Sequence, residues 1–455
     1  MDSNLPEAGV LPGARLSDPF PGTGPKLPPG ISCGLPDCPQ NLGPLNDVGF
    51  DAVGPIPSIS RNVPYEQAWS LGVQKELPWK IVAEANYVGK KGTHLYLGGF
   101  RNLNRLGTDF EQARVSGAIT TDDIRNLARD QVPNPLAPYI TDPLSELSQP
   151  TVHPYRDPGN QFHTPFSQFV GFDGDSPPIA NSIYHAAQFR VEKSFSSGLQ
   201  FLVTYAVSKS IDGASATDDS ISWLGGGLQG NTLSVQNPHN LRAERSLSTF
   251  DIPQVLQFSY VYALPVGRGK RFGGSMNSIL NGAIGGWQLN GIWRFQAGRP
   301  VILVEDSSIR HAIPTYGQRP TLTGPLQVNH SSTLSMISDY FANACDTGNG
   351  QTCPNGDPTG VLIPTADFTL GNAPRTYGGV RQPSSKIVNM ALFKEFPLAG
   401  LREEMRLEFR LEAFNAFNHP NFGPADTALG DGSFGTITSL ATPTREVQLG
   451  LKLYW

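Results

Sequence analysis

Hydrophobic and polar residues alternate with a period of two in several segments of the chain. The alternation begins near residue 67, where Trp69, Leu71 and Val73 share one parity while Ser70 and Gln74 take the other. Period two with one polar face is the pattern of a half-buried β-strand. The pattern recurs at residues 81–87, 188–192, 199–207, 256–262, 287–295, 388–392, 405–412 and 447–455. The chain is therefore predicted to be all-β, with about nine legible strands.

The connections between these strands alternate between two kinds. Four are short or moderate, and lie near Pro78, near Gly198, at 265–286 and at 397–403. Four are long, at 89–183, 211–250, 297–384 and 416–444. Loops longer than about 15 residues are uncommon in compact domains, yet here all four fall on one side of the meander. Outer-membrane barrels combine short periplasmic turns with long extracellular loops in this way.

Strand length and aromatic placement favour a membrane barrel over the alternative of a soluble β-sandwich. The alternating segments run to about 10 residues, the length of a tilted strand that crosses a bilayer, whereas sandwich strands more often have about 5 or 6. Aromatic residues gather at strand ends, as in Trp69, Trp79, Trp287 and Trp455, where barrels carry aromatic girdles. We expect a partial antiparallel transmembrane outer-membrane β-barrel with long extracellular loops.

The chain divides into two regions by composition. Residues 1–66 are rich in proline and glycine and show no period, so they are predicted to form a loop region. Residues 67–455 are predicted to be the C-terminal part of the barrel. The first residues, MDSNLPEAGV, have neither a basic nor an apolar segment of the kind that a secretory signal contains. We therefore expect the sequence to be a fragment of a longer exported protein.

Charge and hydropathy agree with a barrel. Charged residues make up 16% of the chain, against about 25% in a soluble domain, and no apolar run approaches the roughly 18 residues of a membrane helix. Apolar residues interleaved with polar ones explain both facts. The net charge of −5 provides no basic field, so nucleic acid is not expected as a partner.

No segment of the chain meets all the requirements of a known catalytic or cofactor-binding motif. GDGSFG at 430–435 matches a dinucleotide fingerprint, but the TITSLATPTREV that follows favours a strand rather than the required helix. GRGKRFGG at 267–274 lacks the Ser or Thr that a phosphate loop needs after its lysine. Asp346 and the pair Asp218 and Asp219 leave a weak alternative of an ion bound in a loop. We predict no enzyme activity, no cofactor and no metal centre.

Charges alternate along one predicted strand. Arg406, Glu408, Arg410 and Glu412 share a parity opposite to that of Leu407 and its apolar neighbours. Paired carboxylates can perform acid–base chemistry, but an arginine beside each one would keep it ionised. We expect this ladder to lie on the lumen face and to pair across strands or contact a plug.

Several segments resemble the C-terminal portion of TonB-dependent receptors of the Oar-like type, large outer-membrane barrels common in Acidobacteria. The end of the chain carries the resemblance most strongly, in MRLEFRLEAFNAFNHPNFG (405–423) and FGTITSLATPTREVQLGLKLYW (434–455). Residues 63–95, 181–212, 237–273 and 285–301 fit as well. The resemblance extends from about residue 60 to the end, and the combination is more specific than any one piece.

The resemblance implies a functional context. Members of that family carry a signal peptide, a regulatory-like domain, a plug and a barrel of about 22 strands; the last nine or so strands match here, and no plug or TonB box is found. The implied role is uptake of a large or scarce substrate across the outer membrane. The implied partners are outer-membrane lipid, the barrel assembly machinery, which reads a terminal aromatic such as Trp455, and, in the complete protein, a plug domain and the TonB energy-transducing complex.

Two other functions stay open at this stage. A passive structural or adhesin-like surface barrel would need no energised transport, and a secreted β-sandwich binding protein would need no membrane. A plug and a TonB box upstream would favour the transporter, and partition into detergent would exclude the sandwich. The substrate is not legible from the sequence.

The four cysteines are predicted to form two local disulfides, Cys33–Cys38 and Cys345–Cys353, facing the cell exterior. Each pair is close in sequence and lies among glycine, proline, asparagine or aspartate residues, which are typical of loops in an oxidising compartment. Peptide mapping without reduction should recover each pair as one linked peptide from exported protein. Cross-linked peptides that join the two loops, or free thiols, would contradict this pairing.

Overall fold

The computed structural model describes most of the chain. It covers residues 51–53, 62–97, 106, 108–140, 146–164, 167–169, 171–173, 178–213, 235–237, 240–306, 318–344, 360–365, 370–398 and 405–455. The chain forms two compact units, one from Met1–Pro57 with Phe100–Asp175 and one from Ser58–Gly99 with Ser176–Trp455. The four cysteines, and with them both predicted disulfides, lie outside the described residues.

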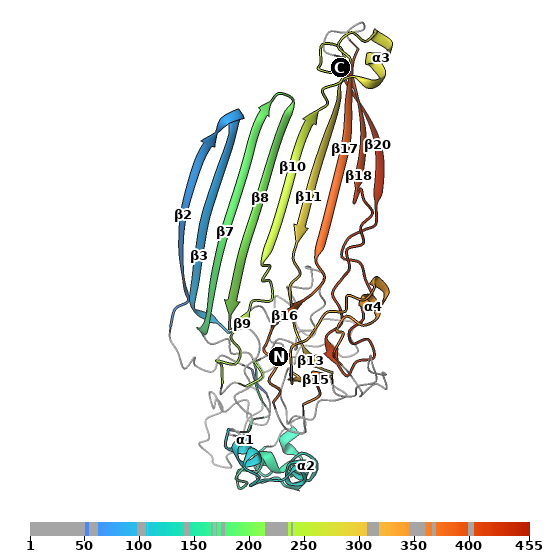
Figure 1. Cartoon of the computed structure of the whole chain (residues 1–455). Helices are drawn as coiled ribbons and strands as arrows, with labels where there is room; N and C mark the ends of the chain where they lie inside the picture. The colour runs from blue at the N-terminus through green and yellow to red at the C-terminus, as the bar shows by residue number, and fades with distance from the viewer. Residues whose placement is uncertain are drawn as a thin grey trace, which may run out of the picture. The chain divides into compact units, whose positions relative to one another are not determined.

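The larger unit is built on one antiparallel meander, which confirms the predicted strands. Its sheet order follows the chain from β2 to β20, and the short β9 (Ser246–Leu247) pairs with β8 off this path. Figure 1 shows the long strands side by side. They are β2 (Tyr65–Leu77), β3 (Ile81–Tyr96), β7 (Pro178–Ser196), β8 (Leu199–Asp212), β10 (Gln254–Ala263), β11 (Trp287–Gln296), β17 (Ser385–Pro397), β18 (Arg406–Phe414) and β20 (Glu446–Tyr454).

Register places the apolar positions of all nine strands on one face. Residues directly opposite in an antiparallel pair point to the same side of the sheet. Val203 of β8 lies opposite Val191 of β7 and Phe258 of β10, and the next pairing joins Phe258 to Trp293 of β11. The same face continues through β17, β18 and β20, where Leu411 lies opposite Leu392 and Leu449. A shift of the pairing register by one residue between any two strands would have moved the apolar side chains of one strand to the opposite face.

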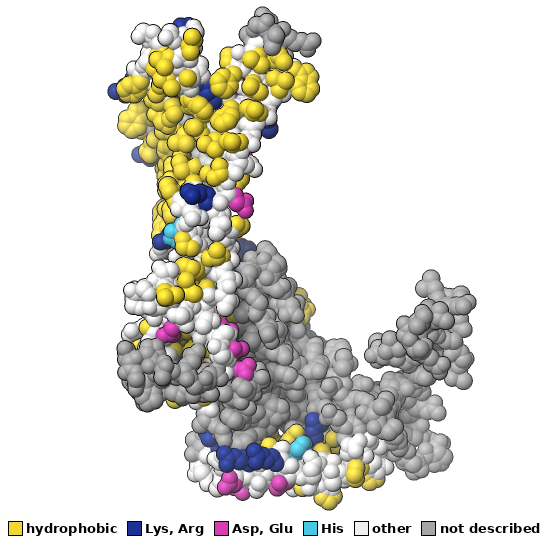
Figure 2. Space-filling model, turned by 90° about the vertical axis from the view of Figure 1, so that its right-hand side faces the viewer, with side chains coloured by type: hydrophobic (Ala, Val, Ile, Leu, Met, Phe, Trp, Pro, Cys, Tyr) yellow, Lys and Arg dark blue, Asp and Glu magenta, His cyan; other side chains and the backbone are white. Residues whose placement is uncertain are grey.

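The opposite face is mixed and mainly polar. Its cross-strand partners include Glu84 with Arg190, Gln257 with Arg294, and Glu412 with Gln448. Two chemically different faces over nine strands are what a barrel wall between lipid and lumen requires. Figure 2 shows hydrophobic side chains covering much of the strand-bearing part on the side that it presents.

Several strands extend beyond the alternation that predicted them. β3 has 16 residues and β7 has 19, and their pairing continues past Gly92 with irregular register. The sequence there, such as NSIY at 181–184, does not alternate between apolar and polar residues. The sheet thus reaches beyond the alternating band at its loop end.

The loop ends of the larger unit contain short paired segments rather than featureless coil. β12 pairs with β16, β13 with β19, and β14 with β15. Their bounds are β12 (Pro300–Val301), β13 (Val304–Glu305), β14 (Thr321–Leu322), β15 (Leu362–Ile363), β16 (Tyr377–Arg381) and β19 (Ala428–Leu429), with helices α3 (Ser278–Ile284) and α4 (Thr333–Ser338) and the 3-10 turn η3 (Pro78–Lys80).

The smaller unit combines Met1–Pro57 with most of the long connection between β3 and β7, and it adds local helical structure. Its α2 begins with a capping box, in which Thr120 and Asp123 bond each other's backbone N–H groups. Ile124 and Leu127 of α2 are buried. The elements are β1 (Asp51–Val53), α1 (Thr108–Val115), α2 (Thr121–Arg129), β4 (Val132–Pro133), η4 (Glu146–Ser148), β5 (Thr151–Val152), η5 (Pro154–Arg156) and β6 (Gly171–Asp173). The division of the chain at residue 66 stays a prediction.

A matched pair of neighbouring substitutions tests the two faces. Met390 of β17 lies opposite Gly291 and Ala413 on the apolar face, whereas Ala391 lies opposite Asn290 and Glu412 on the other. Met390→Arg puts a cation against lipid near mid-membrane, which costs roughly 2–4 kcal/mol. Ala391→Arg puts the same cation beside a carboxylate. Urea titration of protein refolded in vesicles should show the loss for Met390→Arg alone. Equal losses in the two variants would contradict the assignment of faces.

Candidate functional site: membrane band, polar face and loop assembly

Cations bound the apolar face at both ends of the strands. Every charged residue on that face of the nine strands is basic, and between the two levels the described positions carry no charge. Near the short turns these residues are Lys75, Lys193 and Lys394, and toward the loops they are Lys91, Lys209 and Lys386. Lys394 and Lys386 are eight residues apart, and so are Lys91 and Ala83, the residue opposite Lys75, which is about 26 Å along a strand. This spacing suits an apolar band about 25 Å tall.

Two of the lysines near the short turns, Lys193 and Lys394, donate to backbone carbonyls there. Lys193 Nζ bonds Trp79 O at 3.3 Å and Ser196 O at 3.4 Å. Lys394 Nζ bonds Ala283 O at 3.1 Å and Gly285 O at 2.6 Å, and it lies 5.2 Å from the centre of the Trp287 ring. The alkyl stems lie along apolar surface while the charges reach the interface. These lysines therefore mark the boundary of the apolar band at the short-turn end.

The polar face is hollowed across its middle strands. A concavity of about 510 Å³ is lined by residues from β7 to β18. Its walls combine Glu192 and Glu412 with Ser259, Asn290 and the ring of Phe393. Carboxylates, amides and apolar groups together form a surface that can bind a polypeptide segment or an amphipathic solute through hydrogen bonds. The mixed face is thus the concave one.

The ladder on β18 lies on this concave face. Arg410 Nε donates to Glu408, and the Arg410 guanidinium lies 5.0 Å from the centre of the Phe393 ring. Arg406 lies 4.3 Å from the centre of the Tyr454 ring and 3.7 Å from a carboxylate oxygen of Glu395. Every carboxylate of the ladder has a donor, because Tyr454 also donates to Glu408, at 3.3 Å, and Gln448 donates to Glu412. This pattern supports wall structure rather than proton transfer; the lumen role stays a prediction.

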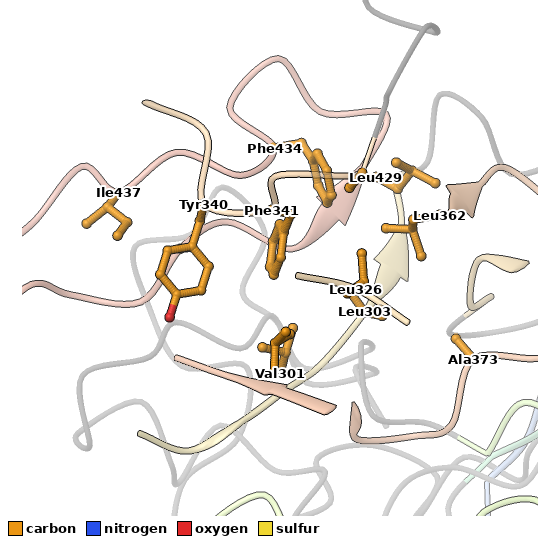
Figure 3. Packing of buried hydrophobic residues seen from close by; sticks show 13 residues of the cluster. Val301, Leu303, Leu326, Tyr340, Phe341, Leu362, Ala373, Leu429, Phe434 and Ile437 are labelled. Atoms are coloured by element: carbon orange, nitrogen blue, oxygen red, sulfur yellow. The ribbon is translucent and has the colours of Figure 1, made fainter. Parts of the chain in front are cut away.

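Loops that the sequence left without a motif fold into a compact assembly, which we call the loop assembly (the described parts of 211–250, 297–384 and 416–444). Its apolar centre joins residues from 301 to 437, and Figure 3 shows them converging. Phe341 and Phe434 stack with ring centres 5.5 Å apart. Tyr340 donates to Arg381 O at 2.6 Å, and burial raises its pKa to about 12. The loop assembly therefore has a core of its own.

Three ion pairs connect the connection after β8 to the connection after β11. Arg319 pairs with Glu244 and Arg375 with Asp212, and all four side chains are at least nine-tenths buried. Arg381 pairs with Asp251 at 2.7 Å, immediately before β10. Burial lowers the pKa of Arg375, and the adjacent Asp212 and Glu244 carboxylates oppose that shift. Breaking a buried pair leaves an uncompensated charge, so these pairs fix the relative positions of the two loops.

Amide groups extend this network. Gln236 N donates to Glu244 Oε1 at 3.1 Å, and Gln236 Nε2 donates to Gly371 O at 2.8 Å. Arg375 Nε donates to Glu244 O at 3.0 Å. Sequence reasoning missed these residues. The one available signal was the cluster of charges in NLRAERSLSTFD at 240–251, unusual in loops that are otherwise poor in charge.

Other sequence candidates lie apart from one another. Trp455 ends the chain with 82% of its surface exposed. The GDGSFG segment forms a turn in which Phe434 N donates to Asp431 O, with β19 before it and no helix after it in the described residues 436–455. Asp218, Asp219 and Asp346 lie outside the described residues. Among residues that the structure does describe, no cluster of His, Cys, Asp and Glu could hold a metal, and no helix is long and apolar enough to span a membrane.

A family model decides the class of protein. The model for the outer membrane beta barrel domain matches residues 10–448, nearly the whole chain. The chain belongs to the outer-membrane β-barrel family. Its location is the outer membrane, its apolar face is the lipid-facing surface, and the loop assembly belongs to the extracellular end.

Comparisons with individual proteins give more distant likenesses. The outer membrane transporter YddB from Escherichia coli is 10% identical with a TM-score of 0.35, over 86% of this chain and 33% of that one. FpvA from P. aeruginosa, in a structure with a heterologous pyoverdine and iron, is 8% identical with a TM-score of 0.31, over 85% and 26%. This barrel chain thus spans about a third or less of their lengths. No curated protein matches it.

The buried ion pairs generate a prediction for the loop assembly. Arg375→Ala removes the buried guanidinium that pairs with Asp212, while Glu244 keeps its pair with Arg319. The uncompensated Asp212 carboxylate should destabilise the loop assembly by about 3–5 kcal/mol. Lys90→Ala removes an exposed pair with Glu66 and should cost under about 1 kcal/mol. Hydrogen exchange should accelerate across 235–251 and 318–381 in Arg375→Ala only, while the strands stay protected. Unchanged exchange in those loops would contradict the structural role of the pair.

Proposed function

We propose that this chain is the C-terminal barrel portion of an outer-membrane receptor that takes up a large or scarce substrate with energy from the TonB complex. The proposal places the chain in the Oar-like group, as the segments at 405–423 and 434–455 suggest. Family membership supports the membrane location. The uptake role goes beyond that membership and rests on the following features.

The observation that carries the proposal is the stiffened loop assembly. A passive barrel needs loops only long enough to join neighbouring strands, because its loops lie outside the membrane and do not have to hold a fixed shape. Here the loops contribute their own aromatic core and two nearly fully buried ion pairs. Burying four charges costs several kcal/mol per ion before pairing repays it. A fixed extracellular surface that bears such a cost is suited to recognise a ligand, because preorganisation lowers the entropy lost on binding.

The concave face supplies the second support. In a transporter the lumen wall must hold a plug segment and later let it move, so strong but reversible polar contacts are needed. The hollow lined by Glu192, Asn290 and Glu412 offers such contacts. Both edge strands, β2 and β20, have one unpaired side among the described residues, and further strands of the longer protein would complete the barrel.

Uptake is testable without knowing the substrate. Three strains are compared: the parent, one whose protein carries Arg375→Ala, and one that lacks TonB. The compounds that remain in spent medium are profiled by mass spectrometry. The proposal predicts that a common set of compounds stays in the medium of both altered strains, since one has lost the recognition surface and the other the energy source. Outer-membrane abundance of the Arg375→Ala protein, measured by heat-modified gel mobility, should match the parent.

Two results would contradict the proposal. The spent medium of all three strains could be the same, or the compounds retained in the medium of the Arg375→Ala strain could be taken up by the strain that lacks TonB. Loss of cell attachment to surfaces in the Arg375→Ala strain, with unaltered uptake, would replace the proposal with the adhesin-like role.

A further inference from the structure

The connection between β10 and β11 differs from the other connections at the periplasmic end. It covers residues 264–286 and contains α3 (Ser278–Ile284). Its charged residues are Arg268, Lys270 and Arg271, with no acid in the segment. Its apolar side chains are exposed: Ile279 by 87%, and Phe272, Leu280 and Ile284 by about half. A soluble protein would bury this set against its own core.

Hydrogen bonds fix α3 to the rim of the lipid-facing surface. Trp287 Nε1 donates to Ala283 O at 3.0 Å, and Lys394 Nζ donates to Ala283 O and Gly285 O. Trp287 and Lys394 lie directly opposite each other on the apolar face. The end of α3 is therefore held over that face, not over the concave one, and at the level where the membrane band ends. Figure 1 shows α3 at the same end of the sheet as the C-terminus.

We propose that residues 264–286 form an interfacial anchor that binds anionic phospholipid of the periplasmic leaflet. Ile279, Leu280 and Ile284 insert between acyl chains. Arg268, Lys270 and Arg271 bind the headgroup phosphates. Amphipathic segments with basic and apolar residues lie in membrane interfaces in this way, and basic residues near a surface select anionic lipid.

Two features of the segment fit this occupant. The apolar side chains of α3 continue the lipid-facing surface of β11 and β17 without an intervening charge other than Lys394, whose Nζ is already engaged by carbonyls. Internal contacts also hold two of the cations in place: Arg268 donates to Met276 O and Ser278 Oγ, both at 3.3 Å, and Arg271 lies 5.6 Å from the centre of the Phe272 ring. The cationic and apolar groups are thus arranged before lipid arrives. The anchor does not depend on whether the barrel transports anything.

Photo-crosslinking in vesicles tests the anchor. Ile279 is replaced by p-benzoylphenylalanine, and the protein is folded into vesicles of phosphatidylcholine with a minority of phosphatidylglycerol. Leu334 of α4, which is 75% exposed at the loop end, receives the same replacement as the matched control. Illumination should attach phospholipid at position 279 and essentially none at 334. Equal lipid attachment at the two positions would overturn the insertion of α3.

The identity of the attached lipid tests the basic residues. At position 279, phosphatidylglycerol adducts should exceed their mole fraction by about fivefold. Adding Lys270→Gln and Arg271→Gln should reduce that excess toward the mole fraction while total lipid attachment stays the same. Adducts that follow the mole fraction in the unaltered segment would overturn the selection of anionic headgroups. Excess that survives both substitutions would overturn the assignment to these residues.

Discussion

The hydrocarbon core of a membrane offers no hydrogen bonds, and this constraint governs the structure. Each backbone N–H and C=O within it needs a partner in the protein, which strands meet only by continuous pairing in a closed sheet. The nine strands from β2 to β20 meet it at each internal pairing, through antiparallel registers that shift only near strand ends, after Gly92 and after Lys193. The same constraint demands an uncharged outer surface. It explains why the apolar residues stay on the same side of the sheet through eight successive strand pairings. It also explains why the cations of this face lie only at its two ends.

Outside the hydrocarbon the requirement changes, and so does the architecture. At the periplasmic end, Lys193 and Lys394 donate hydrogen bonds to backbone carbonyls of the turns that follow the strands. At the extracellular end the backbone can be irregular, because water and side chains supply hydrogen-bond partners for its N–H and C=O groups. Buried arginines then replace sheet pairing as the organising element: Arg375 connects the end of β8 with residues 163 positions later in the chain. The extracellular end thereby acquires a fixed shape without additional long strands.

Most of the sheet could be predicted from the sequence, but little of the loop assembly could. The strands could be recognised because a sheet between lipid and lumen requires apolar and polar residues to alternate, as they do from Leu199 to Val207. The polarity of each residue then indicates which face it lies on, without reference to the rest of the chain. Strand ends such as 178–184 were missed because they extend past the band, where no period is imposed. The pairs Arg319 with Glu244 and Arg375 with Asp212 could not be predicted. Their partners are 75 and 163 residues apart, and no local pattern marks which arginine will be buried. The exposed α3 was equally hidden, since a seven-residue helix among glycines gives too short a signal.

The central claim is that one face of the whole sheet contacts lipid and the other lines the lumen. Spin labels placed one at a time at positions 200–207 of β8, in protein folded into vesicles, measure this directly. Collision rates with oxygen, which concentrates in lipid, and with a water-soluble nickel complex are compared at each position. The account predicts that oxygen accessibility is high at 201, 203, 205 and 207, and that nickel accessibility is high at the positions between them. Accessibility without a period of two, or with the opposite phase, would contradict it.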